Sequence, residues 1–300
     1  MIKTILVTGA TGFIGQQLVP YLQNKGHRVI APTRDEIGDI GPNTDWTSQL
    51  KGIDTVIHLA GRAHVMREDA TDPLSLYRTV NSLGTATLAE QAQKRGVKRF
   101  IFASSVKVMG ESSEHPLSAA LDTPAPSDPY GQSKLEGEDA LKQITKDMQI
   151  VILRLPLVYG PGVKGNFINL LKLLQKNIPL PFGAIHNKRS MIYAANLISA
   201  IDASLTVKAG IYFPSDQDDL STPDLIRILT SALNFSPKLL PIPPIILRLI
   251  GLLTGKGAMI QRLTGSLRVD GKVGDWVPPY SAKEGLISTA NWFKTNGLNR

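Results

Sequence analysis

The chain has 300 residues, of which 42% are hydrophobic and 19% are charged, so we expect a folded protein with one large core or two modest ones. Lys and Arg total 33 against 25 Asp and Glu, a net charge of +8 that suits anionic ligands, but these basic residues are too dispersed to predict a nucleic-acid surface. The chain has no cysteine, which excludes disulfides, thiolate metal sites and thiol catalysis.

Short apolar runs predict the strands. These runs are apolar throughout rather than alternating, which is typical of strands that are covered on both faces. They lie at 5–7, 28–31, 55–59, 100–103 and 150–153. Helical patterns separate them, at 16–24, 75–95 and 130–146, and Asp128-Pro129 is a typical helix start. This alternation predicts an α/β fold with a doubly wound parallel sheet of the Rossmann type.

The alternation becomes irregular after Gly162, apart from an apolar run at 211–213 that predicts a strand returning to the sheet. We therefore expect a first domain over 1–162, to which 188–213 returns. A smaller, mostly C-terminal lobe would comprise 163–187 and 214–300 and bind the substrate.

A glycine-rich turn follows the first predicted strand. The run Thr8-Gly9-Ala10-Thr11-Gly12-Phe13-Ile14-Gly15 leads into the helix at 16–24. Small residues let the backbone approach a pyrophosphate, and the helix N-terminus presents N–H groups and the positive end of a dipole. The sequence thus predicts a dinucleotide-binding domain whose phosphate contacts are Gly9, Thr11, Gly12, Phe13, Ile14 and Gly15.

A second motif, Tyr130-Gly131-Gln132-Ser133-Lys134, predicts a catalytic centre. Tyr130 and Lys134 are four residues apart and share one helix face. An ammonium beside a phenol lowers the pKa of the phenol, so its proton can be moved near neutral pH. This chemistry serves redox reactions of a carbinol or a carbonyl.

The two motifs together resemble the short-chain dehydrogenase/reductase superfamily, and the spacing Thr-Gly-x-x-Gly-x-x-Gly resembles its extended branch, the NAD-dependent epimerase/dehydratase family. The runs Ser104–Glu111 and Gly61–Met66 are most similar to one subgroup, the UDP-N-acetylquinovosamine dehydrogenases. The resemblance implies a reductase of UDP-4-keto-6-deoxy-N-acetylglucosamine in bacterial O-antigen and lipopolysaccharide synthesis, with hydride transfer at sugar C4. It leaves two alternatives open: a UDP-hexose or UDP-N-acetylhexosamine 4-epimerase with tightly bound NAD, and a non-catalytic NADP-sensing regulator.

The end of the second strand suggests the cofactor. An acidic residue there binds the adenosine ribose and selects NAD, but Thr33 stands at that position and Arg34 follows. A guanidinium can pair with a 2′-phosphate, which favours NADP(H), while NAD(H) stays possible if Asp35 or Glu36 takes the ribose. The resemblance adds further cofactor contacts at Asp39, Ile40, Leu59, Ala60, Gly61 and Leu157.

The resemblance also assigns substrate residues. Ser105 would be the third catalytic group, with Ser104 as the alternative, and it would contact the sugar oxygen. Val106 and Lys107 replace the Asp-Glu pair of the sugar dehydratases, and Met109 replaces the tyrosine common in epimerases. Asn166 and Phe167 stand where epimerases contact the sugar nucleotide, Arg189 would hold the diphosphate, and Arg268 is a candidate second ligand.

Other expectations concern partners and location. The histidines at 27, 58, 64, 115 and 186 lack ligand spacing, so we predict structural or solvated histidines and no metal site. The apolar segment 242–253 is shorter than the ~20 residues of a membrane span, and no signal peptide is evident. We expect burial of this segment in the substrate lobe, with weak contact to a membrane surface as the next choice because Lys256, Arg262 and Arg268 lie nearby. A cytoplasmic homodimer that binds a UDP-sugar completes the expectations.

Overall fold

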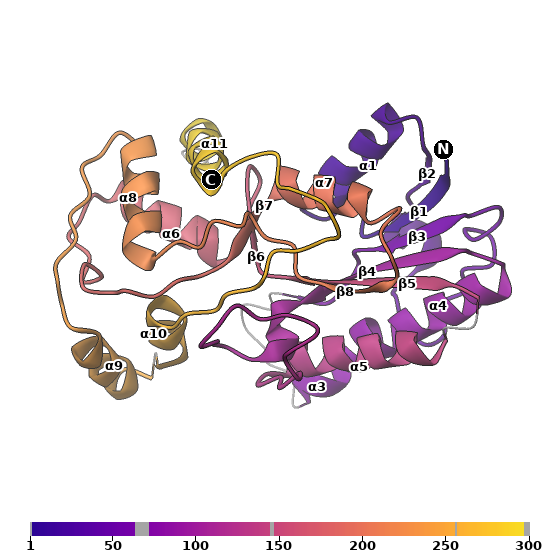
Figure 1. Cartoon of the computed structure of the whole chain (residues 1–300), viewed down its shortest axis with the longest axis horizontal. Coiled ribbons are helices and arrows are strands. Elements are labelled where there is room, and N and C mark those ends of the chain that lie inside the picture. The colour runs from indigo at the N-terminus through magenta and orange to yellow at the C-terminus, as the bar shows by residue number, and fades with distance from the viewer. Residues whose placement is uncertain (1, 64–71, 145–146, 256, 297–300) are drawn as a thin grey trace.

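A computed structural model describes residues 2–63, 72–144, 147–255 and 257–296. Its centre is a parallel sheet whose strands lie in the order β2-β1-β3-β4-β5-β8 (Figure 1). The strands are β1 (Thr4–Thr8), β2 (Arg28–Ile30), β3 (Thr55–His58), β4 (Arg99–Ser105), β5 (Gln149–Leu155) and β8 (Gly210–Tyr212). The predicted fold class is confirmed, including the late strand, because β8 pairs with β5.

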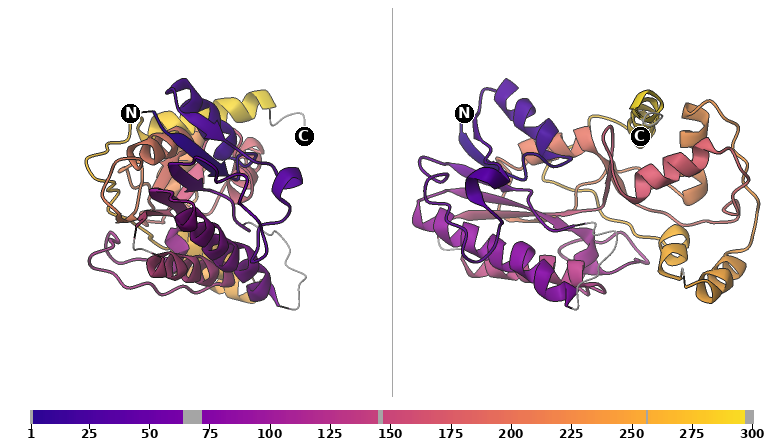
Figure 2. Two further views of the ribbon diagram at one scale, coloured as in Figure 1. Left: turned by 90° about the vertical axis from the view of Figure 1, so that its right-hand side faces the viewer. Right: turned by 180° about the vertical axis from the view of Figure 1, so that it is seen from behind.

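Helices cover both faces of the sheet, as Figures 1 and 2 show. On one face lie α1 (Gly15–Asn24) and α7 (Ala194–Ala203), and on the other lie α3 (Pro73–Arg78), α4 (Gly84–Lys94) and α5 (Pro129–Gln143). Neighbouring residues of β1 pack into the hydrophobic cores on the two faces of the sheet, since Ile5 packs with Leu18 of α1 while Leu6 packs with Leu88 of α4. Burial on both faces explains why these strands are apolar throughout.

The predicted helix at 75–95 is interrupted. A π-helical turn, η1 (Thr79–Leu83), separates α3 from α4, and it carries the buried Asn81. The predicted helix at 130–146 is α5, although Thr145 and Lys146 lie outside the described residues. Two short elements that we did not predict are α2 (Arg34–Ile37) and the 3-10 helix η2 (Val106–Met109).

A second body of structure lies beyond the carboxyl ends of the strands (Figure 1). Its core joins α6 (Asn166–Gln175), α8 (Thr222–Ala232) and α11 (Ala282–Asn296). A two-stranded sheet of β6 (Leu157–Tyr159) and β7 (Met191–Tyr193) lies between it and the main sheet. At its outer end, α9 (Pro244–Leu253) packs on α10 (Gly257–Thr264). We keep the division into 1–162 with 188–213, and 163–187 with 214–300, as a proposal.

Candidate active site

The turn after β1 is built for close backbone approach. Gly9 has a φ of +71°, and a Cβ there would lie 2.7 Å from the nitrogen of Ala60. A Cβ on Gly15 would lie 2.2 Å from the oxygen of Gly9. Thr11 and Gly12 are exposed at the tip, no side chain caps α1, and its first turn has no acidic residue. The turn therefore fits a dinucleotide pyrophosphate, which would lie against the helix N-terminus.

The loop after β3 brings this turn close to the second motif. A Cβ on Gly61 would lie 3.1 Å from Nζ of Lys134 and 2.9 Å from Oδ1 of Asn81. Asn81 holds the main chain of Arg62 by two hydrogen bonds, since its Oδ1 accepts from the nitrogen of Arg62 at 2.9 Å and its Nδ2 donates to the Arg62 oxygen at 3.0 Å. We did not predict a role for Asn81 from the sequence, where its only distinguishing feature is that it is a polar residue within a helical pattern. His64, Val65 and Met66 of the quoted run lie outside the described residues.

Tyr130, Ser105 and Lys134 come together at the carboxyl end of β4. Asp128 caps α5 by accepting a hydrogen bond from Gly131 at 2.6 Å, which sets Tyr130 in the first turn. The hydroxyl of Tyr130 is hydrogen-bonded to Ser105. One turn later, Nζ of Lys134 donates to the oxygen of Ala103 at 2.9 Å and lies 4.6 Å from the centre of the Phe102 ring.

The protonation of this group differs from our expectation. Burial raises the pKa of Tyr130 to about 12, although the Ser105 hydrogen bond opposes this shift. Burial also lowers the pKa of Lys134 to about 8, while Glu138 acts in the opposite direction. The pKa of Tyr130 is therefore raised rather than lowered as expected, because burial of the phenol outweighs the hydrogen bond from Ser105.

Ser104, the alternative to Ser105 as the third catalytic group, belongs to a buried ionic network. Its hydroxyl donates to Glu138 at 2.6 Å, and Glu138 accepts from Nη2 of Arg154 at 2.7 Å. Arg154 also stacks on Phe213 and donates to the sulfur of Met109 at 2.9 Å. Met109 thus directs its side chain to this network. All of these polar side chains are at most 3% exposed.

The adenosine end of the predicted cofactor site contains an exposed ion pair. Nε of Arg34 lies 2.8 Å from Oδ1 of Asp39, and both side chains are more than 80% exposed. Glu36 accepts a hydrogen bond from the nitrogen of Thr33 at 2.6 Å, so this carboxylate is already engaged by a capping box. Ile40 contacts α4, where a Cβ on Gly84 would lie 2.6 Å from it.

The remaining predicted site residues differ in exposure. Leu157, an expected cofactor contact in β6, is 44% exposed, and Asn166, an expected substrate contact, is exposed at the start of α6. Phe167, next to Asn166, is buried, and its ring stacks on that of Tyr159 with 5.6 Å between the ring centres. Arg189 donates to the main-chain oxygens of Arg262 and Gly265, at the end of α10.

Arg268 is close to the loop that follows Ser105. Its Nη2 donates to the oxygen of Glu114 at 3.1 Å. A second contact joins the same regions, because Nη2 of Arg262 lies 3.2 Å from Glu111. Glu111 is also paired with Lys107, two residues after Ser105. The end of α10 therefore contacts the loop that follows Ser105 directly.

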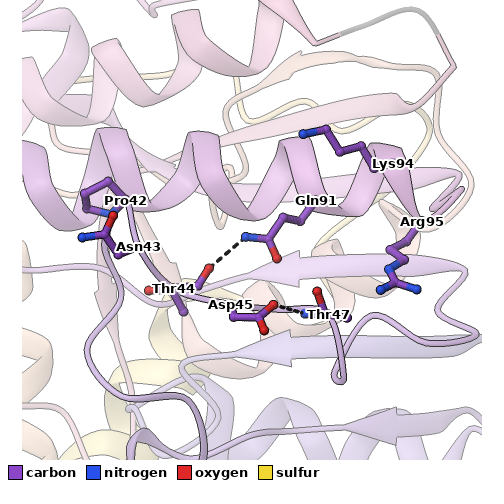
Figure 3. A pocket seen from close by; sticks show the side chains of 8 residues that line it. All are labelled: Pro42, Asn43, Thr44, Asp45, Thr47, Gln91, Lys94 and Arg95. Carbon is purple, nitrogen blue, oxygen red and sulfur yellow. Dashed lines mark hydrogen bonds between the residues drawn. The ribbon is translucent and has the colours of Figure 1, made fainter.

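Two other features lie apart from catalysis. His58 is fully buried between Thr8 and Thr85, and burial lowers its pKa to about 3, so it is a neutral structural residue as predicted. Figure 3 shows a hollow near the C-terminal end of α4, where Gln91 donates to the oxygen of Thr44. This end of α4 leads into the start of β4, so the hollow lies at the amino ends of the strands, whereas Tyr130 lies at their carboxyl ends.

Comparison with known proteins identifies relatives over the whole length. The model of the family described as "NAD dependent epimerase/dehydratase family" matches residues 5–212. The chain is 43% identical to a UDP-glucose 4-epimerase of Vibrio cholerae, over 98% of this chain and 96% of that one. It is 32% identical to the N-acetyl-α-D-glucosaminyl-diphospho-ditrans,octacis-undecaprenol 4-epimerase of Escherichia coli O157:H7, over 78% of this chain and 73% of that one.

Solved structures share the fold. A UDP-glucuronic acid 4-epimerase from Bacillus cereus in complex with NAD is 26% identical, with a TM-score of 0.73 over 97% of this chain and 96% of that one. RMD from Pseudomonas aeruginosa, complexed with NADPH, is 23% identical, with a TM-score of 0.75 over 98% and 100% of the two chains. Structural neighbours thus bind NAD or NADPH.

Proposed function

The chain belongs to the NAD-dependent epimerase/dehydratase family, and we propose that it catalyses NAD(P)-dependent 4-epimerisation of a UDP-sugar. The observation that carries this proposal is the hydrogen bond between Tyr130 and Ser105 beside the glycine turn, with Lys134 one helical turn away. Members of this family are NAD(P)-dependent oxidoreductases and epimerases, so the chain is an enzyme rather than a non-catalytic regulator.

Each residue of the group has a distinct task in the proposed reaction. When bound, the nicotinamide would accept and return a hydride at sugar C4. Tyr130 would take the proton of the C4 hydroxyl as the ketone forms and return it as the ketone is reduced. Ser105 would hold the same oxygen by a hydrogen bond, and Lys134 would bind the nicotinamide ribose. Rotation of the ketone between these two steps would invert C4.

The diphosphate contacts are part of the same proposal. Arg189 and Arg268 would pair with the diphosphate, because guanidinium groups bind phosphate oxygens in a bidentate manner. Both arginines donate to main-chain oxygens here, Arg189 to those of Arg262 and Gly265 at the end of α10 and Arg268 to that of Glu114. Asn166, exposed at the start of α6, would contact the sugar nucleotide.

One observation favours a 4-ketoreductase as a second candidate. Met109 replaces the tyrosine of the common epimerase pattern and contacts Arg154. The candidate reaction is reduction of a UDP-4-keto-6-deoxy-N-acetylhexosamine to UDP-N-acetylquinovosamine for surface polysaccharide. The 43% identity to the Vibrio cholerae epimerase over 98% of this chain supports epimerisation as the first candidate.

The cofactor preference is also a proposal. Arg34 is the only basic side chain in the capped segment 33–37, and it favours NADP(H) through a 2′-phosphate. Retained NAD(H) is the alternative, as an epimerase would need it through the whole catalytic cycle.

A panel of substrates separates these candidates. The purified enzyme would first be examined for the absorbance of bound dinucleotide, then incubated with UDP-glucose, UDP-N-acetylglucosamine and UDP-4-keto sugars. An epimerase yields the C4 epimer without added reductant, whereas a reductase oxidises NADPH or NADH only with a 4-keto sugar. The Escherichia coli relative acts, by its name, on a polyprenyl diphosphate sugar, so such a substrate belongs in the panel. If none of the sugars in the panel is converted, the proposal is overturned.

A further inference from the structure

The expected burial of segment 242–253 is wrong. In α9, Leu247 and Gly251 are buried against α10, and a Cβ on Gly251 would lie 2.8 Å from Ile260. The rest of the apolar side chains of this helix are exposed: Ile245 61%, Ile246 44%, Leu249 54%, Ile250 50%, Leu252 76% and Leu253 86%. Soluble proteins rarely expose so many neighbouring apolar side chains without a partner.

These six residues form one continuous face of α9. At about 100° per residue they cover an arc of about 160°, and the two buried residues lie on the opposite side. Arg248 is exposed and lies beside the arc, next to Leu252 on the helical wheel. The exposed Met259 of α10 adds to the apolar surface. We call this surface, made of the six residues and Met259, the α9 face.

The chain segment that carries the α9 face is basic. Residues 225–269 contain no Asp or Glu, whereas they contain Arg227, Lys238, Arg248, Lys256, Arg262 and Arg268. Two of these cations have acidic partners outside the segment, Arg227 with Asp224 and Arg262 with Glu111. Lys256 lies outside the described residues, but its charge belongs to the same segment. A second copy of this face would bring further cations against these, so charge opposes a symmetric pairing of two such faces. An apolar face with cations beside it complements an anionic lipid surface.

The position of the α9 face is also suited to contact with a flat surface. In Figures 1 and 2, α9 lies at the extreme end of the molecule, away from the main sheet. Its ten residues span about 15 Å, which is too short to cross a bilayer. No helix in the described ranges is long and apolar enough for that role. The helix can therefore lie in the lipid interface and leave the rest of the chain in water.

We propose that the α9 face docks the enzyme, reversibly, on an anionic bilayer surface. The apolar side chains would enter the boundary between headgroups and acyl chains, while Arg248 and its neighbours pair with anionic headgroups. The end of α10 that carries Arg262 contacts both Arg189 and Glu111, so docking would place the proposed diphosphate end of the active site near the membrane.

Flotation of the full-length protein with vesicles tests the docking. We expect binding to vesicles that contain phosphatidylglycerol at low ionic strength, little binding to pure phosphatidylcholine, and weaker binding as salt rises. The triple variant Leu249→Gln, Leu252→Gln, Leu253→Gln should lose more than about tenfold of this binding. Leu121→Gln, which changes a leucine that is 81% exposed outside the α9 face, is the matched control and should bind like the wild type.

The outcomes separate docking from other uses of the face. Circular dichroism and turnover of a soluble UDP-sugar verify that the variants are folded, since the three leucines lie outside the proposed catalytic group. No flotation of the wild type with anionic vesicles at low salt would overturn the proposal. Equal flotation of the triple variant would also overturn it. So would a wild-type dimer that the triple variant dissociates without any change in lipid binding, because a second copy would then cover the face.

Discussion

The hydroxyl of Ser104 lies 2.6 Å from a carboxylate oxygen of Glu138, whereas Ser105, the next residue, is hydrogen-bonded to Tyr130. Adjacent residues at the end of a strand project to opposite sides, so only one of the two hydroxyls can reach the catalytic tyrosine. Ser104 is 3% exposed and already satisfied by a charged partner. This relationship favours Ser105 over Ser104 as the group that contacts substrate.

Alanine variants of the two serines should therefore fail in different ways. We expect Ser105→Ala to lower kcat by about 10²-fold or more with little change in stability, because a donor to the reacting oxygen is lost. Ser104→Ala should keep kcat within a few-fold but lower the free energy of unfolding by about 1–3 kcal/mol, because a buried carboxylate loses a donor. Steady-state kinetics and urea unfolding of both variants check this. The reverse pattern would exchange the two roles.

Tyr130→Phe tests proton transfer. The variant keeps the ring but lacks the only phenol that Ser105 holds in place, so kcat should fall by roughly 10²–10⁴-fold. Binding of the UDP-sugar, measured by calorimetry, should change little. A variant that retains more than half of the wild-type activity would show that another group moves the proton.

Much of the main sheet was predictable because its signals are local. The apolar runs that became β1 and β5 and the glycines at 9, 12 and 15 need only neighbouring residues to be interpreted, and the strand at 211–213 does return to the sheet. The pairing of Tyr130 with Ser105 followed from family spacing. The choice between Ser104 and Ser105 did not, because it depends on Glu138, which lies 34 residues further along the chain.

Long-range contacts also decide which side chains are buried in the lobe. The ring of Phe167 is buried by Tyr159 and the helices of the lobe. Segment 242–253 has the composition of a core helix, yet within α9 only Leu247 and Gly251 are buried. Neither outcome is encoded in local periodicity, since both depend on where α10 and α8 are placed by distant parts of the chain.

Arg34→Asp tests the cofactor preference. The change replaces a cation with a carboxylate beside Asp39, which would repel a 2′-phosphate, so the ratio of kcat/KM for NADPH to that for NADH should fall roughly tenfold or more. Arg28→Asp is the matched control, because Arg28 is exposed at the start of β2, whereas Arg34 follows the other end of this strand. A wild type that already prefers NADH, with a ratio that neither substitution moves, would reject the role of Arg34.

The buried pair of Glu138 and Arg154 should be important for stability. Glu138→Gln leaves the guanidinium without a counter-ion at a site that is 2% exposed, so we expect a loss of about 3–5 kcal/mol in the free energy of unfolding. The double variant Glu138→Leu, Arg154→Met should recover much of this loss, since neither charge is then buried alone. Guanidinium chloride titrations compare the three proteins. A double variant as unstable as the single one would contradict the assignment of the loss to an unpaired charge.

Lys134→Met should reveal the buried ammonium through the pH dependence of stability. The unfolded chain holds this proton up to its ordinary pKa of 10.5, whereas the folded chain releases it near a pKa of about 8 because burial disfavours the charge. Unfolding of the wild type therefore takes up a proton between these values, so its stability relative to the variant should rise as pH increases from about 8 to 10.5. The total rise should approach 3 kcal/mol, about 1.4 kcal/mol for each pH unit between the two pKa values.

Below pH 8 the folded and the unfolded wild type both hold the Lys134 proton, so the difference in stability between wild type and variant should be constant there. Parallel urea unfolding of both proteins across this range measures the difference, in which the titration of all other groups cancels. A difference that is independent of pH would mean that Lys134 keeps its ordinary pKa in the folded chain, and that the ammonium is better solvated than its contacts with Ala103 and Phe102 indicate.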